Sequence, residues 1–276
     1  MSKELEHLVQ VGSLEFGAWW LQLGNKLKPE GRKHFKHLFH LIATGQETSL
    51  SQHSHILDGY RQHVNGLENL VQFREKNTLV LSNHSHLGPL EGYGETILTS
   101  YYVKKFTDEE IRWIRGHGKS LKENARQLVD KSLGTIPIYD DSFMSLKPII
   151  EAFKNNETIG LYPEGDNSIA LRQANPTAGN LVLIALARDI PIICASTWFE
   201  HDTFFVRFSP LLDQEKYKEI QNILNGKLTR QEKNRMKEKI INYAMAIIAS
   251  HLPEEKRGYY HNFQDFISAF EKLTAK

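Results

Sequence analysis

Residues 78–91 join a short apolar run, a polar loop and the start of a second apolar segment. They read Thr78-Leu79-Val80-Leu81-Ser82-Asn83-His84-Ser85-His86-Leu87-Gly88-Pro89-Leu90-Glu91. The run at 78–82 has the length of a buried strand, and residues 90–105 have the apolar spacing of a helix. A strand that leads into a helix is the first half of a parallel β-α-β unit. This stretch therefore predicts an α/β fold.

The alternation of strands and helices continues toward the C-terminus. A helix is predicted at residues 121–132, and the tail from Asp213 is expected to be helical because an apolar stripe recurs among its Lys and Glu residues. Pro137 places its strand at a sheet edge or at a strand start. Further strands are predicted at residues 111–114, 135–139, 158–162, 190–195 and 203–208. We therefore predict a mixed, mostly parallel sheet flanked by helices.

Residues 1–65 have a helical apolar pattern and are predicted to form an N-terminal helical hairpin region, followed by an α/β domain at 66–276 with a helical C-terminal tail. The first helix is expected at about residues 5–26, a turn at 28–31, and a second helix through Phe35 and Ile42. Trp19 and Trp20 lie near basic residues, as in helices that bind a lipid interface. The alternative is that these aromatic side chains pack against the core.

The composition excludes several classes of protein. The 276 residues carry 34 Lys and Arg against 33 Asp and Glu, so a nucleic-acid binder that relies on overall positive charge is not expected. The single cysteine, Cys194, excludes an intrachain disulfide and a zinc site built from several thiolates. Neither a secretory signal pattern nor an apolar run of about 18 residues occurs. We expect a cytoplasmic protein, with membrane association as the alternative.

Two loops carry more polar residues than a plain turn needs. The first holds His84 and His86, with Glu91 five positions later, and a histidine beside a carboxylate forms an acid–base pair. If Pro89 begins the helix, Glu91 lies in the first turn and faces back toward His86. The second loop, residues 162–168, contains a Pro-Glu-Gly turn directly after a predicted strand. Ligands of open α/β sheets bind beyond the carboxyl ends of strands, so both loops lie where a site is expected.

Together the two loops resemble the glycerol-phosphate and lysophospholipid acyltransferase family. The family's first block is Asn-His followed by four residues and Asp, and its third block is Phe-Pro-Glu-Gly-Thr-Arg-Ser. The chain has Asn83-His84 in the first loop, and its second loop reads Tyr162-Pro163-Glu164-Gly165-Asp166-Asn167-Ser168. Residues 134–139 and 190–193 are similar to two further strand motifs of the family, in the same order. The resemblance covers about residues 65–210.

The resemblance implies an acyltransferase that moves a fatty acyl group from acyl-CoA or acyl carrier protein to a hydroxyl or amine of a glycerolipid, lysophospholipid or related acceptor. A histidine would be the general base and an acid would orient it. Counted from His86, the family's acid position falls on Glu91, so we assign these two, with His84 as the alternative base. The residues expected to bind substrate are Asn83, Tyr162, Pro163, Glu164, Gly165, Asp166, Asn167, Ser168 and Arg172. No metal and no cofactor besides the thioester co-substrate is implied.

The acceptor site departs from the family pattern. Where the second and third blocks usually carry arginines that bind the acceptor phosphate, this chain has Tyr139-Asp140 and Asn167, and an amide cannot replace a guanidinium at a phosphate. We therefore expect an acceptor other than simple glycerol phosphate, unless Arg172 substitutes. Two rival functions remain: a metal-dependent hydrolase that uses the His-Ser-His loop, and an inactive lipid-binding relative.

Overall fold

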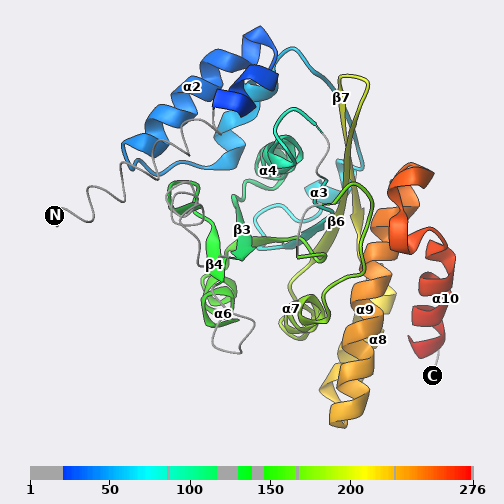
Figure 1. Ribbon diagram of the computed structural model, residues 1–276. Coiled ribbons are helices and arrows are strands. Elements are labelled where there is room, and N and C mark those ends of the chain that lie inside the picture. Colours follow the sequence, from blue (N-terminus) through cyan, green and yellow to red (C-terminus); the bar gives the residue numbers. More distant parts are fainter. Residues whose placement is uncertain are drawn as a thin grey trace, which may run out of the picture.

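The chain folds around one mixed sheet that ends in an edge strand on each side (Figure 1). The computed structural model describes residues 21–85, 88–116, 130–138, 146–165, 168–226 and 228–274. Among these, seven strands are ordered β1-β7-β6-β2-β5-β3-β4, and only the β6–β7 pair is antiparallel. The strands are β1 (Arg61–Asn65), β2 (Leu79–Ser82), β3 (Ile111–Gly116), β4 (Ile136–Ile138), β5 (Thr158–Leu161), β6 (Ile192–Glu200) and β7 (Thr203–Pro210). The predicted α/β class with a mostly parallel sheet is confirmed.

Helices cover both faces of the sheet (Figure 1). One face packs against the N-terminal elements α2 (Pro29–Ala43), the 3-10 helix η1 (Leu50–Leu57), α3 (Glu68–Val71) and α4 (Tyr93–Thr107). The core on the other face contains α6 (Lys147–Lys154), α7 (Pro176–Ala187), α8 (Gln214–Asn225), α9 (Arg230–His251) and α10 (Phe263–Thr274), of which α10 packs on α9 and α8. Side chains of β2 divide between the two cores in the alternation of a strand covered on both sides: Leu79 and Leu81 face one, Val80 the other.

The neighbouring strands β2 and β5 send their chains to opposite faces of the sheet. After β2 the chain enters α4, which packs in the core with Val80, whereas after β5 it enters α7, in the core with Leu79. Such a divergence is a topological switch point, where the loops that leave the carboxyl ends of two adjacent strands separate. The two loops singled out in the sequence are these two connections.

The structure differs from the predicted local structure at three places. Residues 28–31 are not a turn, because α2 already begins at Pro29, whose fixed φ suits the first position of a helix. The helix after β2 begins at Tyr93 and not at Pro89 or Leu90, because Glu91 and Gly92 adopt left-handed backbone angles. Strand β1 was not predicted, since its residues are mostly exposed and lack an alternating apolar pattern. Pro137 does lie in an edge strand, β4.

The N-terminal region shares a core with α4 and the sheet, and η1 packs against α4. Leu27, Phe35 and Leu57 belong to the same buried cluster as Val80 of β2 and Phe204 of β7. Residues 21–26 are helical, while the rest of the predicted first helix and most of the helix predicted at 121–132 lie outside the described residues. The boundary at residue 65 stays a prediction. No described helix is long and apolar enough to cross a membrane.

Candidate functional site

The two loops are joined at the carboxyl ends of β2 and β5. Ser85 and Ser168 form a parallel β-bridge, in which the Ser168 backbone N–H donates to the carbonyl oxygen of His84 at 3.0 Å. This bridge lies beyond the ends of β2 and β5 and in a different register: paired residues are 80 positions apart in the strands but 83 apart at the bridge. Residues some 80 positions apart in the sequence therefore form one continuous surface at the switch point.

The side chain of Glu164 joins the two loops through hydrogen bonds. Its side chain is 9% exposed, and its carboxylate accepts hydrogen bonds from the His84 backbone N–H (3.2 Å), the Ser168 hydroxyl (2.9 Å) and the Arg172 backbone N–H (2.8 Å). Burial raises the pKa of Glu164, and these donors, together with the charge of Arg172, oppose that shift. Its three hydrogen bonds let the buried Glu164 side chain hold the two loops together. They also place an acidic group beside both loops.

His84 is held in a stack of three rings. Its imidazole lies flat on the Tyr162 ring, with centroids 4.2 Å apart, and Tyr162 in turn stacks on Trp113 at 4.6 Å. On the other side, a Cβ added to Gly92 would lie 2.8 Å from Cε1 of His84, so only glycine leaves room for the ring. The Tyr162 hydroxyl is hydrogen-bonded to the Thr96 hydroxyl of α4. The His84 ring is therefore fixed in orientation by packing.

Glu91 does not lie in the first turn of a helix, as the sequence suggested. It has a left-handed backbone (φ 52°) two residues before α4, and its carboxylate lies 2.7 Å from the ammonium of Lys26. Both groups of this ion pair are partly exposed, which limits its contribution to stability. His86, the assigned base, lies outside the described residues, so its pairing with Glu91 stays a prediction.

A second carboxyl group under the first loop was not predicted from the sequence. Glu95 is in α4, is 3% exposed, and its Oε1 lies 3.7 Å from the position of a Cβ on Gly88. Neither carboxyl oxygen has a hydrogen-bond partner among the described residues. Burial raises the pKa of Glu95 from 4.5 to about 8, and the nearby Ser85 side chain opposes this shift. The available signal was a charged residue two positions before the apolar pair Ile97-Leu98 in a predicted helix.

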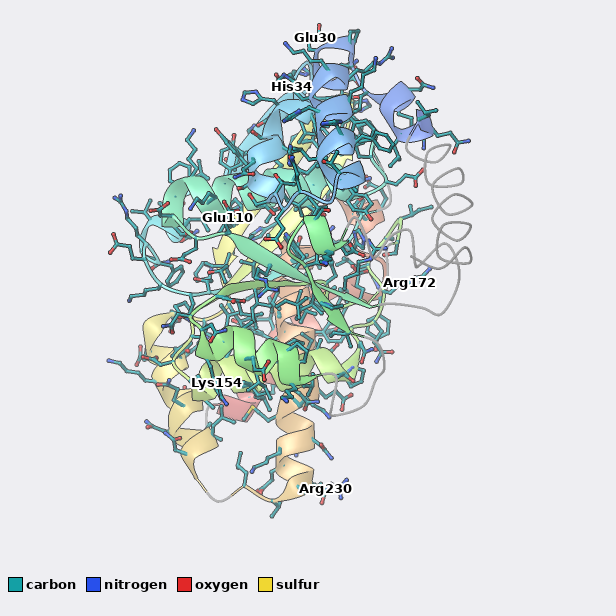
Figure 2. All side chains as sticks on the ribbon, turned by 90° about the vertical axis from the view of Figure 1, so that its left-hand side faces the viewer. Glu30, His34, Glu110, Lys154, Arg172 and Arg230 are labelled. Carbon is teal, nitrogen blue, oxygen red and sulfur yellow. The ribbon has the colours of Figure 1, made fainter. Side chains whose placement is uncertain are left out.

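Several other predicted site residues have structural partners. The side-chain amide of Asn83 both donates to and accepts from the backbone of Thr197, each at 2.7 Å, and so ties the end of β2 to β6. Pro163 and Gly165 form the predicted tight turn, closed by a hydrogen bond from the Gly165 N–H to the Tyr162 carbonyl at 3.0 Å. Arg172 is exposed (Figure 2). Asp166 and Asn167 lie outside the described residues.

Backbone donors for a developing oxyanion are limited. The N–H groups of His84, Gly165 and Ser168 are all used in hydrogen bonds within and between the loops. They cannot also stabilise a bound carbonyl unless the loops change shape. Cys194 is buried in β6, where burial raises the pKa of its thiol, so it offers no nucleophile to the site.

The site thus combines a histidine-bearing loop, a buried carboxylate that orders both loops, and a second buried carboxyl group below them. Among the described residues, side chains grouped closely enough to hold a metal ion occur elsewhere, at His34, His55 and Asp58. No family model matches the chain, and its sequence matches no curated protein.

Proposed function

We propose that the chain is an acyltransferase that moves a fatty acyl group from acyl-CoA or acyl carrier protein to a hydroxyl or amine of a lipid or polyol acceptor. The observation that carries the proposal is the joining of the Asn-His-Ser-His loop to the Tyr-Pro-Glu-Gly loop through Glu164 and the Ser85–Ser168 bridge. These two loops are the counterparts of the first and third blocks of the acyltransferase family that the sequence resembles. Their position at a switch point supports a ligand site there.

In the proposed reaction His86 takes the proton from the acceptor hydroxyl as its oxygen attacks the thioester carbonyl. The new C–O bond forms, the C–S bond breaks, and the proton passes from the imidazolium to the departing thiolate. Glu164 is a positioning residue, because its contacts to described residues set the spacing of the loops. No covalent acyl-enzyme is required.

The proposed acceptor is not simple glycerol phosphate. Tyr139, Asp140 and Asn167, which replace the family's arginines, lie outside the described residues, and this part of the proposal rests on their chemistry. Arg172 is the basic residue nearest in sequence to the second loop, with its backbone bonded to Glu164. We propose a lipid or polyol acceptor without a tightly bound phosphate, reached in the cytoplasm or by peripheral contact of the N-terminal region with a membrane.

The test is release of free thiol from acyl-CoA or acyl carrier protein in the presence of a panel of acceptors: glycerol phosphate, lysophospholipids, polyols and amines. We expect release that depends on an acceptor. His86→Ala should lower the rate by about 10²–10⁴-fold, the contribution of a general base, whereas His84→Ala should leave most of the activity.

His40→Ala provides the matched control, because this histidine is exposed on α2 and belongs to neither loop. Loss of activity in His84→Ala but not in His86→Ala would reverse the assignment of the base. Thiol release that no acceptor stimulates would contradict the transfer reaction, and preferred use of glycerol phosphate would contradict the argument from the missing arginines.

A further inference from the structure

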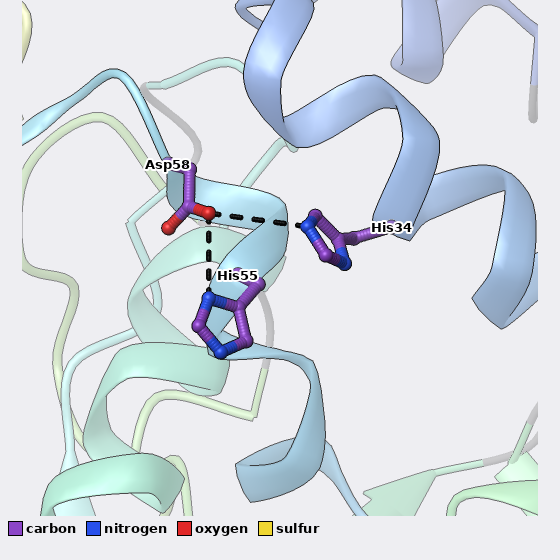
Figure 3. A group of neighbouring side chains, drawn as sticks. All are labelled: His34, His55 and Asp58. Atoms are coloured by element: carbon purple, nitrogen blue, oxygen red, sulfur yellow. Dashed lines mark hydrogen bonds and ion pairs between the residues drawn. The ribbon is translucent and has the colours of Figure 1, made fainter.

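A group of three metal-ligating side chains lies on the N-terminal elements, away from the two loops. His34 projects from α2, His55 from η1, and Asp58 follows η1 as its C-terminal cap (Figure 3). One oxygen of Asp58, Oδ2, lies 3.3 Å from Nδ1 of His55 and 4.0 Å from Nε2 of His34. One ligand atom from each residue lies within 4.8 Å of the others.

We propose that His34, His55 and Asp58 bind a divalent transition-metal ion, with zinc as the best match. Two imidazole nitrogens and a carboxylate oxygen suit zinc and its neighbours in the first transition series, whereas magnesium and calcium prefer oxygen ligands alone. Zinc with three protein ligands completes a tetrahedron with water, and the exposure of the group leaves that position open.

The geometry is close to what zinc requires. Bonds of about 2.0–2.1 Å in a tetrahedron place ligand atoms roughly 3.3 Å apart. The distance from His55 to Asp58 already has this value, and that from His34 to Asp58 is 4.0 Å. The His34 side chain is 36% exposed, and the three ligand atoms lie within 4.8 Å of one another, so binding requires them to draw together by at most about 1.5 Å.

An ordinary surface ion pair explains only part of this arrangement. One histidine beside Asp58 would be such a pair, but a second ring from a different element approaches the same oxygen, and the two ring centroids are 5.2 Å apart. A single cation coordinated by both rings and the carboxylate accounts for all three side chains.

The backbone brings the three ligands together. A Cβ added to Gly31 would lie 2.1 Å from the carbonyl oxygen of Ile56, so α2 and η1 touch through their main chains. His34 follows Gly31 by one helical turn, and His55 and Asp58 flank Ile56. Phe35 of α2 and Leu57 of η1 are buried in the same core cluster, so side-chain packing also holds these two elements together.

One further carboxylate lies beside the group, on a helix whose other charged residues, Arg32, Lys33 and Lys36, are basic. Glu30, one turn before His34 on α2, has its carboxylate 2.8 Å from the position of a Cβ on Gly59, the residue after Asp58 (Figure 2 labels Glu30 and His34). The side chain of Lys28 also lies near Gly59 through its Cβ and Cγ, and its ammonium is paired with Asp202 at 2.6 Å. A bound metal ion would therefore link α2 to η1 as a structural clamp.

The experiment uses the full chain, stripped of metal with a chelator and titrated with Zn²⁺ by calorimetry and with Co²⁺ by visible absorption. We expect one ion per chain and a tetrahedral Co²⁺ spectrum. His55→Ala and Asp58→Asn should each weaken binding by more than the roughly 10–100-fold that loss of an outer-shell partner costs. Both side chains are substantially exposed, so these variants should fold.

His40→Ala is the matched control, because His40 is exposed on the same helix and does not belong to the group. It should bind zinc as the wild type does. Zinc at about a hundredfold excess over Kd should also raise the Tm of the wild type and of His40→Ala, but not of the two ligand variants. Absence of saturable binding, or binding that survives loss of both His34 and His55, would overturn the proposal.

Discussion

Glu95 and Glu164 are two buried carboxyl groups near the same loop, and their surroundings differ sharply. Glu164 accepts three hydrogen bonds, whereas the side-chain group near the Glu95 carboxyl that opposes the effect of burial is the Ser85 hydroxyl. An unpaired charge in such a place is costly, so Glu95 holds a proton at neutral pH, in accord with a pKa raised to about 8 by burial. Glu95 is thus a neutral acid close to the loop that carries the proposed base.

The proton on Glu95 makes the free energy of unfolding depend on pH. Because the folded protein keeps a proton that the unfolded chain releases near pH 4.5, the free energy of unfolding should fall as pH rises through the interval from about 4.5 to 8. His53, whose pKa burial lowers from 6.5 to about 4, acts in the opposite direction only below about pH 6.5. The interval from pH 6.5 to 8 therefore isolates the effect of Glu95 from that of His53.

Glu95→Gln should remove this dependence, because the amide keeps the shape of the acid and cannot ionise. Relative to the wild type, the variant should gain stability between pH 6.5 and 8, by at most about 1.4 kcal/mol per pH unit. Urea unfolding at several pH values measures the effect. Glu151→Gln, at an exposed position of α6, should keep the wild-type slope. A parallel pH profile for Glu95→Gln and the wild type would show that Glu95 is ionised in the folded protein.

For individual residues, the sequence predicted which two loops carry the candidate site, but not which side chains from other elements contact them. The loops follow apolar strand runs, a signal that depends only on neighbouring residues. The contact of Glu95 with the first loop depends on the rotation of α4, which begins at Tyr93 after two left-handed residues, and no local pattern marks that start. His55 belongs to a second His-Ser-His, at 53–55, and its contact with His34 depends on how α2 packs on η1.

Among the elements, the pair α2 and η1 is defined by close backbone contact. Gly31 lies where any larger residue would meet the Ile56 carbonyl, so the helix approaches η1 more closely than side chains normally permit. The predictable part of this pair was α2, whose apolar residues recur with helical spacing. Strand β1 was not predictable in the same way, because an exposed edge strand needs no apolar alternation and obtains its hydrogen bonds from β7.

Gly31→Ala should separate α2 from η1. Although alanine is the better helix former by about 1 kcal/mol, its Cβ would overlap a backbone oxygen, and such overpacking typically costs about 1–3 kcal/mol. We expect a net loss in the free energy of unfolding and weaker binding of zinc by the group on these elements. Gly116→Ala is the control, since a Cβ there meets no described residue within 4 Å, and it should change stability by no more than about 0.5 kcal/mol. Unchanged stability of Gly31→Ala would show that the close contact is not required.

For the whole molecule, the decisive feature is that the N-terminal region completes one of the two cores. Eight buried apolar side chains of the cluster that contains Val80 and Phe204 precede residue 61: Leu23, Leu27, Phe35, Leu38, Ile42, Leu50, Ile56 and Leu57. At about 1.5–3 kcal/mol for each fully buried side chain, their contribution rivals the 5–15 kcal/mol by which a domain is usually stable.

Deletion of residues 1–60 should therefore prevent stable folding, even though it leaves every strand of the described sheet in place. The apolar side chains of α4 and β7 that pack against residues before 61 would be exposed to solvent, and we expect aggregation or loss of near-ultraviolet circular dichroism. Because aggregation can have other causes, Leu57→Ala in the full chain gives a second measurement. This substitution should lower the free energy of unfolding by about 2–5 kcal/mol and shift a single transition seen by near- and far-ultraviolet signals together. Two separate transitions, or a truncated chain as stable as the full one, would instead show that residues 1–65 are an independent domain.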